Sequence, residues 1–195
     1  MRLLAFSDIH RDLRQAGRLA ERARDVDVVL AAGDLASVHR GLEEVIEVLA
    51  AIETPTVLVA GNNETDAALR AACVGWSAAH VLHGQGVEID GVSFFGLGGG
   101  VPVTPWDWSF DLAEEEAAER LAGCPRGAVL VVHSPPKGHV DGSRRLGSQA
   151  VLEAIEDKQP RFAVCGHIHE AAGEQDRIGE SRVLNVGPSG IVLDL

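Results

Sequence analysis

Short apolar runs alternate along the chain with segments of helical periodicity, and this alternation limits the fold more than any other feature. The runs VDVVLAA (residues 26–32) and TVLVA (Thr56–Ala60) are almost wholly apolar, as in strands that are buried on both faces of a sheet. Apolar residues also recur at helical spacing in Leu13–Arg24, between the first of these runs and the strand-like segment Arg2–Ser7. The pattern is that of a βαβ unit, and it predicts parallel strands connected by helices.

The rest of the chain shows the same alternation of strand-like and helix-like segments. We expect strands at Arg2–Ser7, Asp27–Ala32, Thr56–Ala60, Ala128–Val132, Arg161–Cys165, Arg182–Val186 and Ile191–Leu193. We expect helices at Leu13–Arg24, Leu42–Leu49, Thr65–Cys73, Leu112–Leu121 and Ser148–Asp157. Asp90-Gly91 separates two apolar runs and predicts a hairpin. The prediction is a single α/β domain over residues 1–195, with a sandwich or two-layered sheet covered by helices.

Composition narrows the classes of partner. The formal net charge of −12 argues against a nucleic acid or an anionic membrane as partner, because both bind basic surfaces. No apolar run approaches the roughly 18 residues of a membrane helix, and the first residues turn polar too soon for a secretory signal, so we expect a cytoplasmic protein. Cys73, Cys124 and Cys165 follow no metal-binding or disulfide spacing and are predicted to be buried thiols.

Five of the predicted strands run directly into polar residues. These segments are Ser7-Asp8-Ile9-His10, Gly33-Asp34, Gly61-Asn62-Asn63-Glu64, His133-Ser134 and Gly166-His167-Ile168-His169. Ligands bind at the carboxyl ends of strands in α/β sheets, because loops there project side chains into a common crevice. We therefore expect the following side chains to meet: Asp8, His10, Asp34, Asn62, His133, His167 and His169.

Oxygen and imidazole donors of this kind suit Mn, Fe, Zn or similar divalent ions. Seven ligands exceed what one ion takes once a water and a substrate oxygen are counted, so two ions with a bridging Asp fit better. Residues i and i+2 of an extended segment point the same way. We therefore expect Asp8 and His10, or His167 and His169, to face one centre.

Each signal also has a simpler interpretation when it is taken alone. Gly33-Asp34 is a common turn sequence, Asp8 could cap a helix beside a surface His10, and His133 could be a core histidine with a satisfied hydrogen bond. These interpretations require a coincidence at five strand ends. Metal binding is therefore the favoured hypothesis.

The series Asp8-x-His10, Gly33-Asp34, Gly61-Asn62, His133 and Gly166-His167-x-His169 resembles the motif series of the calcineurin-like metallophosphoesterases, from about residue 2 to 190. The resemblance implies a four-layer α/β/β/α sandwich with a dinuclear centre. It implies that Asp8, His10 and His169 bind one ion, that Asn62, His133 and His167 bind the other, and that Asp34 bridges both. It also implies Mn²⁺ as the first choice of metal, with Fe, Ni²⁺, Zn²⁺ or Co²⁺ as alternatives, and a bridging hydroxide that attacks phosphorus.

One position departs from the family pattern. Many members have His directly after the metal-binding Asn, whereas this chain has Asn63. An amide is no general acid near neutral pH, so esters with poor leaving groups are expected to react more slowly, by about 10²–10⁴-fold. The small bacterial and archaeal phosphodiesterases of the family commonly lack this His as well, which favours a diester substrate. Asn63 and His139 are the catalytic candidates, His139 as a substitute proton donor or else as a surface histidine.

Three further features each allow two interpretations. Gly96–Gly100 could let the backbone approach a substrate phosphate or could form a tight turn. Trp106 and Trp108 could stack on a nucleobase, but the interpretation favoured here is that they pack over the core. Asn185 is a candidate for supporting the metal ligands from behind.

The predicted function is a metal-dependent phosphodiesterase acting on a small phosphoester, with nucleotide-like compounds among the candidates. A phosphomonoesterase and a non-catalytic metal-binding scaffold for protein partners are the alternatives. A nuclease is disfavoured because a long polyanion would be repelled by the net charge of −12. We expect no membrane partner, and a homo-oligomer is left open.

Overall fold

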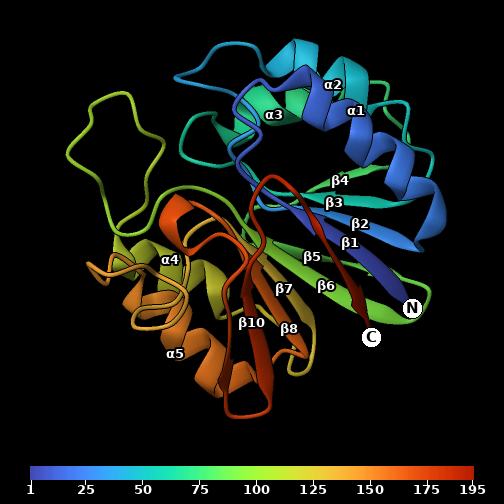
Figure 1. Cartoon of the computed structure of the whole chain (residues 1–195). Coiled ribbons are helices and arrows are strands. Elements are labelled where there is room, and N and C mark those ends of the chain that lie inside the picture. Colours follow the sequence, from blue (N-terminus) through green and yellow to red (C-terminus); the bar gives the residue numbers. More distant parts are fainter.

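The structure, a computed structural model, describes residues 1–195, whose strands form two sheets (Figure 1). The five-stranded sheet has the order β11 (Ile191–Asp194), β1 (Arg2–Phe6), β2 (Val28–Ala31), β3 (Thr56–Leu58) and β4 (Ala79–Val81). The six-stranded sheet has the order β5 (Gln85–Ile89), β6 (Val92–Leu97), β7 (Val129–Val132), β8 (Phe162–Cys165), β10 (Ser181–Asn185) and β9 (Gln175–Ile178). The strands at three of the four edges, β11, β5 and β9, are antiparallel to their neighbours, and the remaining pairs are parallel.

Helices cover the outer face of each sheet, which gives four layers (Figure 1). The five-stranded sheet carries α1 (Leu13–Arg22), α2 (Leu42–Leu49) and α3 (Asp66–Ala72), and the six-stranded sheet carries α4 (Glu114–Leu121) and α5 (Gln149–Lys158). Two short 3₁₀ helices, η1 (Ala23–Asp25) and η2 (His169–Ala171), complete the fold. The α/β/β/α sandwich expected from the resemblance is confirmed.

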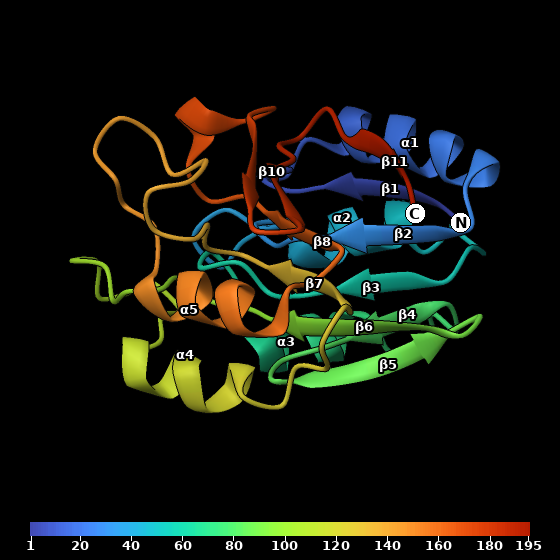
Figure 2. The same ribbon diagram turned by 90° about the horizontal axis from the view of Figure 1, so that it is seen from below.

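Side chains alternate between two cores along each strand, as the pleat requires. Leu3 of β1 points into the core between the sheets, where it joins Phe94 and Val129, whereas Leu4 points into the core beneath α1–α3. The strands are therefore buried on both faces, as their continuous apolar sequences predict. Figure 2 shows β2, β3, β6 and β7 pointing in the same direction, so that the carboxyl ends of strands from both sheets lie at one edge of the sandwich.

The hairpin prediction is confirmed at β5 and β6, where Ile89 pairs with Val92 across Asp90-Gly91. Both turn residues have positive φ, 49° at Asp90 and 76° at Gly91, as a type I′ turn requires.

Two edge strands were not predicted, and one helix begins later than expected. β4 has only three residues, and β9 exposes three of its four residues, so neither shows an apolar run. The helix predicted from Leu112 begins at Glu114, because the backbone of the preceding residue, Ala113, is extended (φ −68°, ψ 154°). The helix predicted to reach Arg24 ends at Arg22 and continues as η1.

The glycine run 96–100 serves close packing between the sheets. A Cβ on Gly98 would lie 2.6 Å from the carbonyl oxygen of Ala60, next to the end of β3. None of these glycines lines the cavity described below, which gives the phosphate contact no support, and the φ of 95° at Gly99 fits a tight turn.

The favoured expectation for Trp106 and Trp108 is wrong. Both lie on the long loop between β6 and α4, which projects from the sandwich (Figure 1). Trp106 is 51% exposed, and neither indole belongs to a core.

The three cysteines are free and buried, as predicted. Burial raises the pKa of Cys73 and of Cys124 to about 11, which keeps both thiols protonated. None of the helices combines the length and the apolar character needed to cross a bilayer.

Packing in the core between the sheets should contribute to the free energy of unfolding. Phe94 is fully buried there, so Phe94→Ala should lower the free energy of unfolding by about 3–5 kcal/mol in urea denaturation. The control Val74→Ala, at a side chain that is 84% exposed, should change it by less than about 0.5 kcal/mol. Equal effects of the two substitutions would contradict a packed interface between the sheets.

Candidate metal centre

The ends of five strands from the two sheets meet at the carboxyl edge of the sandwich. Asp8 and Asp34 follow β1 and β2, and Asn62 follows β3, in the five-stranded sheet. His133 and His167 follow β7 and β8 in the six-stranded sheet. Backbone hydrogen bonds bind these ends together, from the Asp8 amide to Gly33 at 2.9 Å and from the Gly166 amide to His133 at 3.0 Å. The structure brings all seven predicted side chains together.

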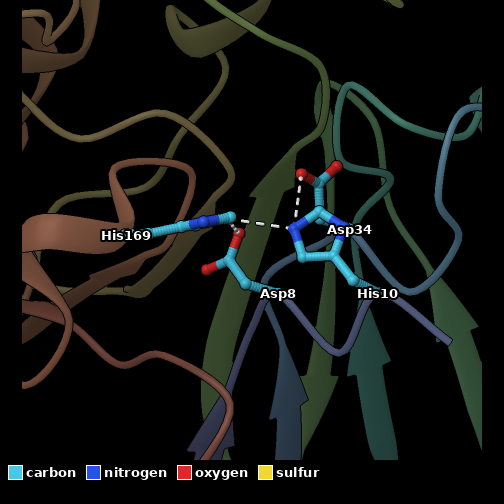
Figure 3. Close-up of side chains that lie close together, drawn as sticks. All are labelled: Asp8, His10, Asp34 and His169. Atoms are coloured by element: carbon cyan, nitrogen blue, oxygen red, sulfur yellow. Dashed lines mark hydrogen bonds and ion pairs between the residues drawn. The ribbon is translucent and has the colours of Figure 1, made fainter. Parts of the chain in front are cut away.

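One group of four potential ligands consists of Asp8, His10, Asp34 and His169 (Figure 3). The Nε2 atoms of His10 and His169 are 3.0 Å apart. His10 Nε2 lies 3.5 Å from Asp34 Oδ2, and His169 Nε2 lies 3.5 Å from Asp8 Oδ1. Two imidazole lone pairs at this distance repel each other unless a proton or a cation lies beside them.

Asp34 also belongs to a second group, with His133 and His167. Its other carboxylate oxygen, Oδ1, lies 3.5 Å from His133 Nε2. Asn62 completes this group, since its Oδ1 is 3.2 Å from both His133 Nε2 and His167 Nδ1. Asp34 therefore faces one group with each oxygen, and the two groups match the assignment implied by the resemblance.

Hydrogen bonds at the far side of two rings select the tautomer that leaves Nε2 free. His133 Nδ1 lies 2.8 Å from the carbonyl oxygen of Ala32, and His10 Nδ1 lies 3.2 Å from that of Ala36. A carbonyl only accepts, so each Nδ1 must carry the proton. In the neutral ring each Nε2 then presents a lone pair to the centre, as metal-binding histidines do.

The expected extended backbone is wrong, but Asp8 and His10 do face one group as expected, whereas His167 and His169 do not. Asp8, His10, Asp34 and His167 all have positive φ, at 57°, 44°, 55° and 67°. Left-handed backbone is strained for residues with a Cβ and gathers at functional sites. The left-handed turn at His167 directs it to the second group, whereas His169, two residues later, belongs to the first.

Buried polar neighbours orient the two carboxylates. Ser7 Oγ donates to Asp8 Oδ2 at 2.5 Å, and the His167 amide donates to Asp8 Oδ1 at 3.1 Å. Asn63 donates twice to Asp34, from its backbone N to Oδ1 at 2.9 Å and from Nδ2 to Oδ2 at 2.7 Å. Asn63 Oδ1 in turn accepts from the Val38 amide at 2.8 Å. Asn63 lines the cavity but uses its amide to hold Asp34 in place.

Burial and charge shift the acidities in opposite directions across the centre. Burial raises the pKa of Asp8, but the hydrogen bond with His169 and the charge of His133 outweigh it, so this pKa is lowered. Burial lowers the pKa of His133, but Asp34 and Asp8 raise it by more. Burial and repulsion by His133 lower the pKa of His167 to about 3, so this imidazole is neutral and able to bind a cation.

Glu64 is a buried residue of the centre that sequence reasoning missed. Its carboxylate accepts from the amides of Gly61 at 2.8 Å, Ala36 at 2.9 Å and Leu35 at 3.3 Å, and so ties together the turns that carry Asp34 and Asn62. Burial and the charge of Asp34 raise its pKa to about 7. A carboxylate directly after the Gly61-Asn62-Asn63 strand end was the available signal.

Asn185 supports the second histidine motif from behind, in agreement with its expected role. Its Nδ2 donates to the carbonyls of Ile168 at 2.9 Å and Gly166 at 3.1 Å, on either side of His167. Gly166 itself needs the absence of a side chain, because a Cβ there would lie 2.5 Å from Asp8 Oδ2.

The structure does not bring His139 to this centre. Its Nδ1 lies 2.7 Å from Asp176 Oδ2 on β9, and His139 does not line the cavity that contains the metal-ligand groups. Its partner is an acidic residue of an exposed edge strand, which the sequence pattern did not reveal. The alternative interpretation as a surface histidine describes it correctly.

The donor set fits a pair of divalent cations. Two buried carboxylates, an amide oxygen and four imidazoles converge, and one carboxylate is common to both groups. Asp8 and Asp34 make their ion pairs with histidines only, and none with a lysine or an arginine. Asp8, His10, Asp34 and His169 would hold one ion, and Asp34, Asn62, His133 and His167 the other.

Comparison with curated proteins finds a relative of similar length. The chain is 29% identical to the uncharacterized protein MJ1162 of Methanocaldococcus jannaschii over 201 residues, which cover 96% of this chain and 88% of that protein.

Solved structures share the fold at low sequence identity. The protein TT1561 of Thermus thermophilus superposes with a TM-score of 0.79 at 19% identity, over 96% of this chain and 90% of that one. A dimetal phosphatase from Danio rerio gives a TM-score of 0.64 at 12% identity, over 95% and 86% of the two chains. A novel archaeal phosphodiesterase gives 0.58 at 19% identity, over 96% and 84%.

The decisive comparison is with protein families. The family model described as the calcineurin-like phosphoesterase superfamily domain matches residues 1–194, and so spans all five strand ends. The chain belongs to the calcineurin-like phosphoesterase superfamily.

Proposed function

We propose that the chain is a metal-dependent phosphoesterase that hydrolyses small phosphodiesters at a centre of two divalent ions. The observation that carries the proposal is the shared carboxylate, since Asp34 belongs to both ligand groups and turns one oxygen toward each. Mn²⁺ is the proposed occupant, because imidazole and carboxylate ligands together suit it. The dimetal phosphatase and the archaeal phosphodiesterase with the same fold support this class of reaction.

Two divalent cations held there would neutralise charge on phosphoryl oxygens and lower the pKa of a water molecule toward neutrality. The residues of the chain hold the ligand geometry. Glu64 and Asn63 fix the turns that carry Asp34, and Ser7 fixes Asp8. This support from behind preorganises the site before substrate arrives.

Asn63 affects which substrates react. Its amide cannot give up a proton near neutral pH, so a leaving oxygen receives none from this position. Aryl esters, whose leaving groups depart as stable anions, are therefore the proposed good substrates. The net charge of −12 further favours small substrates over long polyanions.

The first test compares two esters with the same leaving group. Protein loaded with Mn²⁺ should hydrolyse bis(p-nitrophenyl) phosphate with a kcat/KM about 10-fold or more above that for p-nitrophenyl phosphate. Release of p-nitrophenolate measures both, and protein treated with a chelator is the control. A higher kcat/KM for the monoester would identify the chain as a phosphomonoesterase. No hydrolysis of either ester would favour the non-catalytic scaffold.

The second test removes the shared charge. Asp34→Asn should lose at least one of two bound ions by elemental analysis and should lower kcat/KM for the diester by at least about 100-fold, beyond what loss of an outer partner costs. Asp194→Asn, at a side chain that is 84% exposed, is the matched control and should keep both ions. Unchanged metal content in Asp34→Asn would contradict the bridging role.

The third test addresses Asn63. Asn63→Leu keeps the branching of the side chain and all seven ligands but removes the side-chain hydrogen bonds to Asp34 and from the Val38 amide. We expect it to weaken Mn²⁺ affinity about 10–100-fold in calorimetric titration, as loss of an outer-shell partner does. Wild-type affinity in this variant would show that the hydrogen bond does not orient Asp34.

A further inference from the structure

A cavity of about 700 Å³ opens from the metal-ligand groups and is bounded on one side by the loop between β6 and α4. His10, Asp34 and His169 are among the residues that line it. Trp106 and Trp108 line it from the projecting loop. A volume of this size is that of a site for a small organic molecule, and it is much larger than a phosphate group needs.

The two indoles form a flat aromatic surface at the rim of the cavity. Their ring centroids are 5.6 Å apart with an angle of 13° between the planes, so they stack on each other. Trp106 nevertheless remains 51% exposed. An exposed indole contributes little to the core, and a stacked pair loses little conformational entropy when a flat ligand packs on its free face.

Hydrogen bonds hold this loop in place. Asp111 accepts from the Thr104 amide at 2.7 Å and from the hydroxyls of Thr104 at 2.6 Å and Ser109 at 2.7 Å. Ser109 Oγ in turn accepts from Asn62 Nδ2 at 2.9 Å. The His39 ring donates to the Trp108 carbonyl at 2.5 Å. The loop that carries the two indoles is therefore hydrogen-bonded through Ser109 to Asn62, a proposed metal ligand, which fixes its position relative to the centre.

A single arginine lines the cavity. Arg144, on the loop that precedes α5, makes no ion pair. Glu170, which also lines the cavity, accepts hydrogen bonds from Ser143. The hydrogen bonds from Ser143 and the charge of Arg144 lower the pKa of Glu170. In a chain with net charge −12, this guanidinium beside the metal-ligand groups also offers a binding partner for an anionic oxygen of the substrate.

We propose that this cavity selects small phosphodiesters that carry a planar aromatic group, such as a nucleobase, and that the aromatic group stacks on Trp106. The inference rests on the proposed function, because it places the phosphoryl group at the metal-ligand groups. It adds the substrate class. Every nucleobase has a flat π-face that can stack on an indole, so this surface distinguishes planar groups from non-planar groups and not one base from another.

The test uses phosphonates, whose P–C bond is not an ester and is not hydrolysed. Phenylphosphonate, cyclohexylphosphonate and methylphosphonate are titrated calorimetrically into protein saturated with Mn²⁺. We expect phenylphosphonate to bind about 10-fold more tightly than methylphosphonate, with cyclohexylphosphonate at least about 3-fold weaker than phenylphosphonate. Equal binding of the phenyl and cyclohexyl compounds would overturn selection for a planar group.

Variants at Trp106 test whether this residue causes the preference for phenylphosphonate over methylphosphonate. Trp106→Leu should bind the phenyl and methyl compounds within about 2-fold of each other, whereas Trp106→Phe should keep most of the preference because it retains an aromatic face. Circular dichroism and metal content establish that both variants are folded. A preference that survives in Trp106→Leu, or that is lost equally in Trp106→Phe, would overturn the inference.

Binding and turnover fail independently in this design. A protein that prefers phenylphosphonate through Trp106 but hydrolyses no ester would keep the inference about the cavity and overturn the proposed function. An active phosphodiesterase without this preference would keep the proposed function and overturn the inference about the cavity.

Discussion

The buried carboxylate of Asp34 is the interaction on which the rest of the centre depends. It is 2% exposed and turns its two oxygens toward imidazoles from opposite sheets, His10 after β1 and His133 after β7. A buried anion is costly unless positive charge or hydrogen bonds compensate it. Here Asn63 supplies two hydrogen bonds, and the surrounding donor set can supply charge only by binding cations or protons. Metal binding at this centre would thus be coupled to folding through Asp34.

The four-layer architecture makes this arrangement available. Parallel strands in each sheet send their carboxyl ends to one edge, and the apolar core between the sheets brings the two edges into register. Neither sheet alone holds a complete group, because Asp8, His10 and Asp34 come from one sheet and His133, His167 and His169 from the other. The strained turns at Asp8, Asp34 and His167 are stabilised by this surrounding structure.

Much of this could be predicted from sequence, because strands buried on both faces have a strong apolar signature and their polar ends are conspicuous. The buried strands and the seven converging side chains are of this kind, whereas the four-layer order was expected only from the resemblance to the calcineurin-like metallophosphoesterases. Backbone handedness was not predictable, since nothing in Asp8-Ile9-His10 distinguishes left-handed turns from extended chain. The exposure of Trp106 was predicted wrongly, and the pairing of His139 with Asp176 was not predicted, because loop direction and this pairing depend on contacts between residues far apart in sequence. Edge strands β4 and β9 lack the apolar run by which strands are recognised.

The claim that two ions share one carboxylate is tested most directly by electron paramagnetic resonance during titration with Mn²⁺. The account predicts that two equivalents bind per chain and that the six-line signal of isolated Mn²⁺ is replaced by the spectrum of a spin-coupled pair. Saturation at one equivalent, with the six-line signal intact, would contradict it.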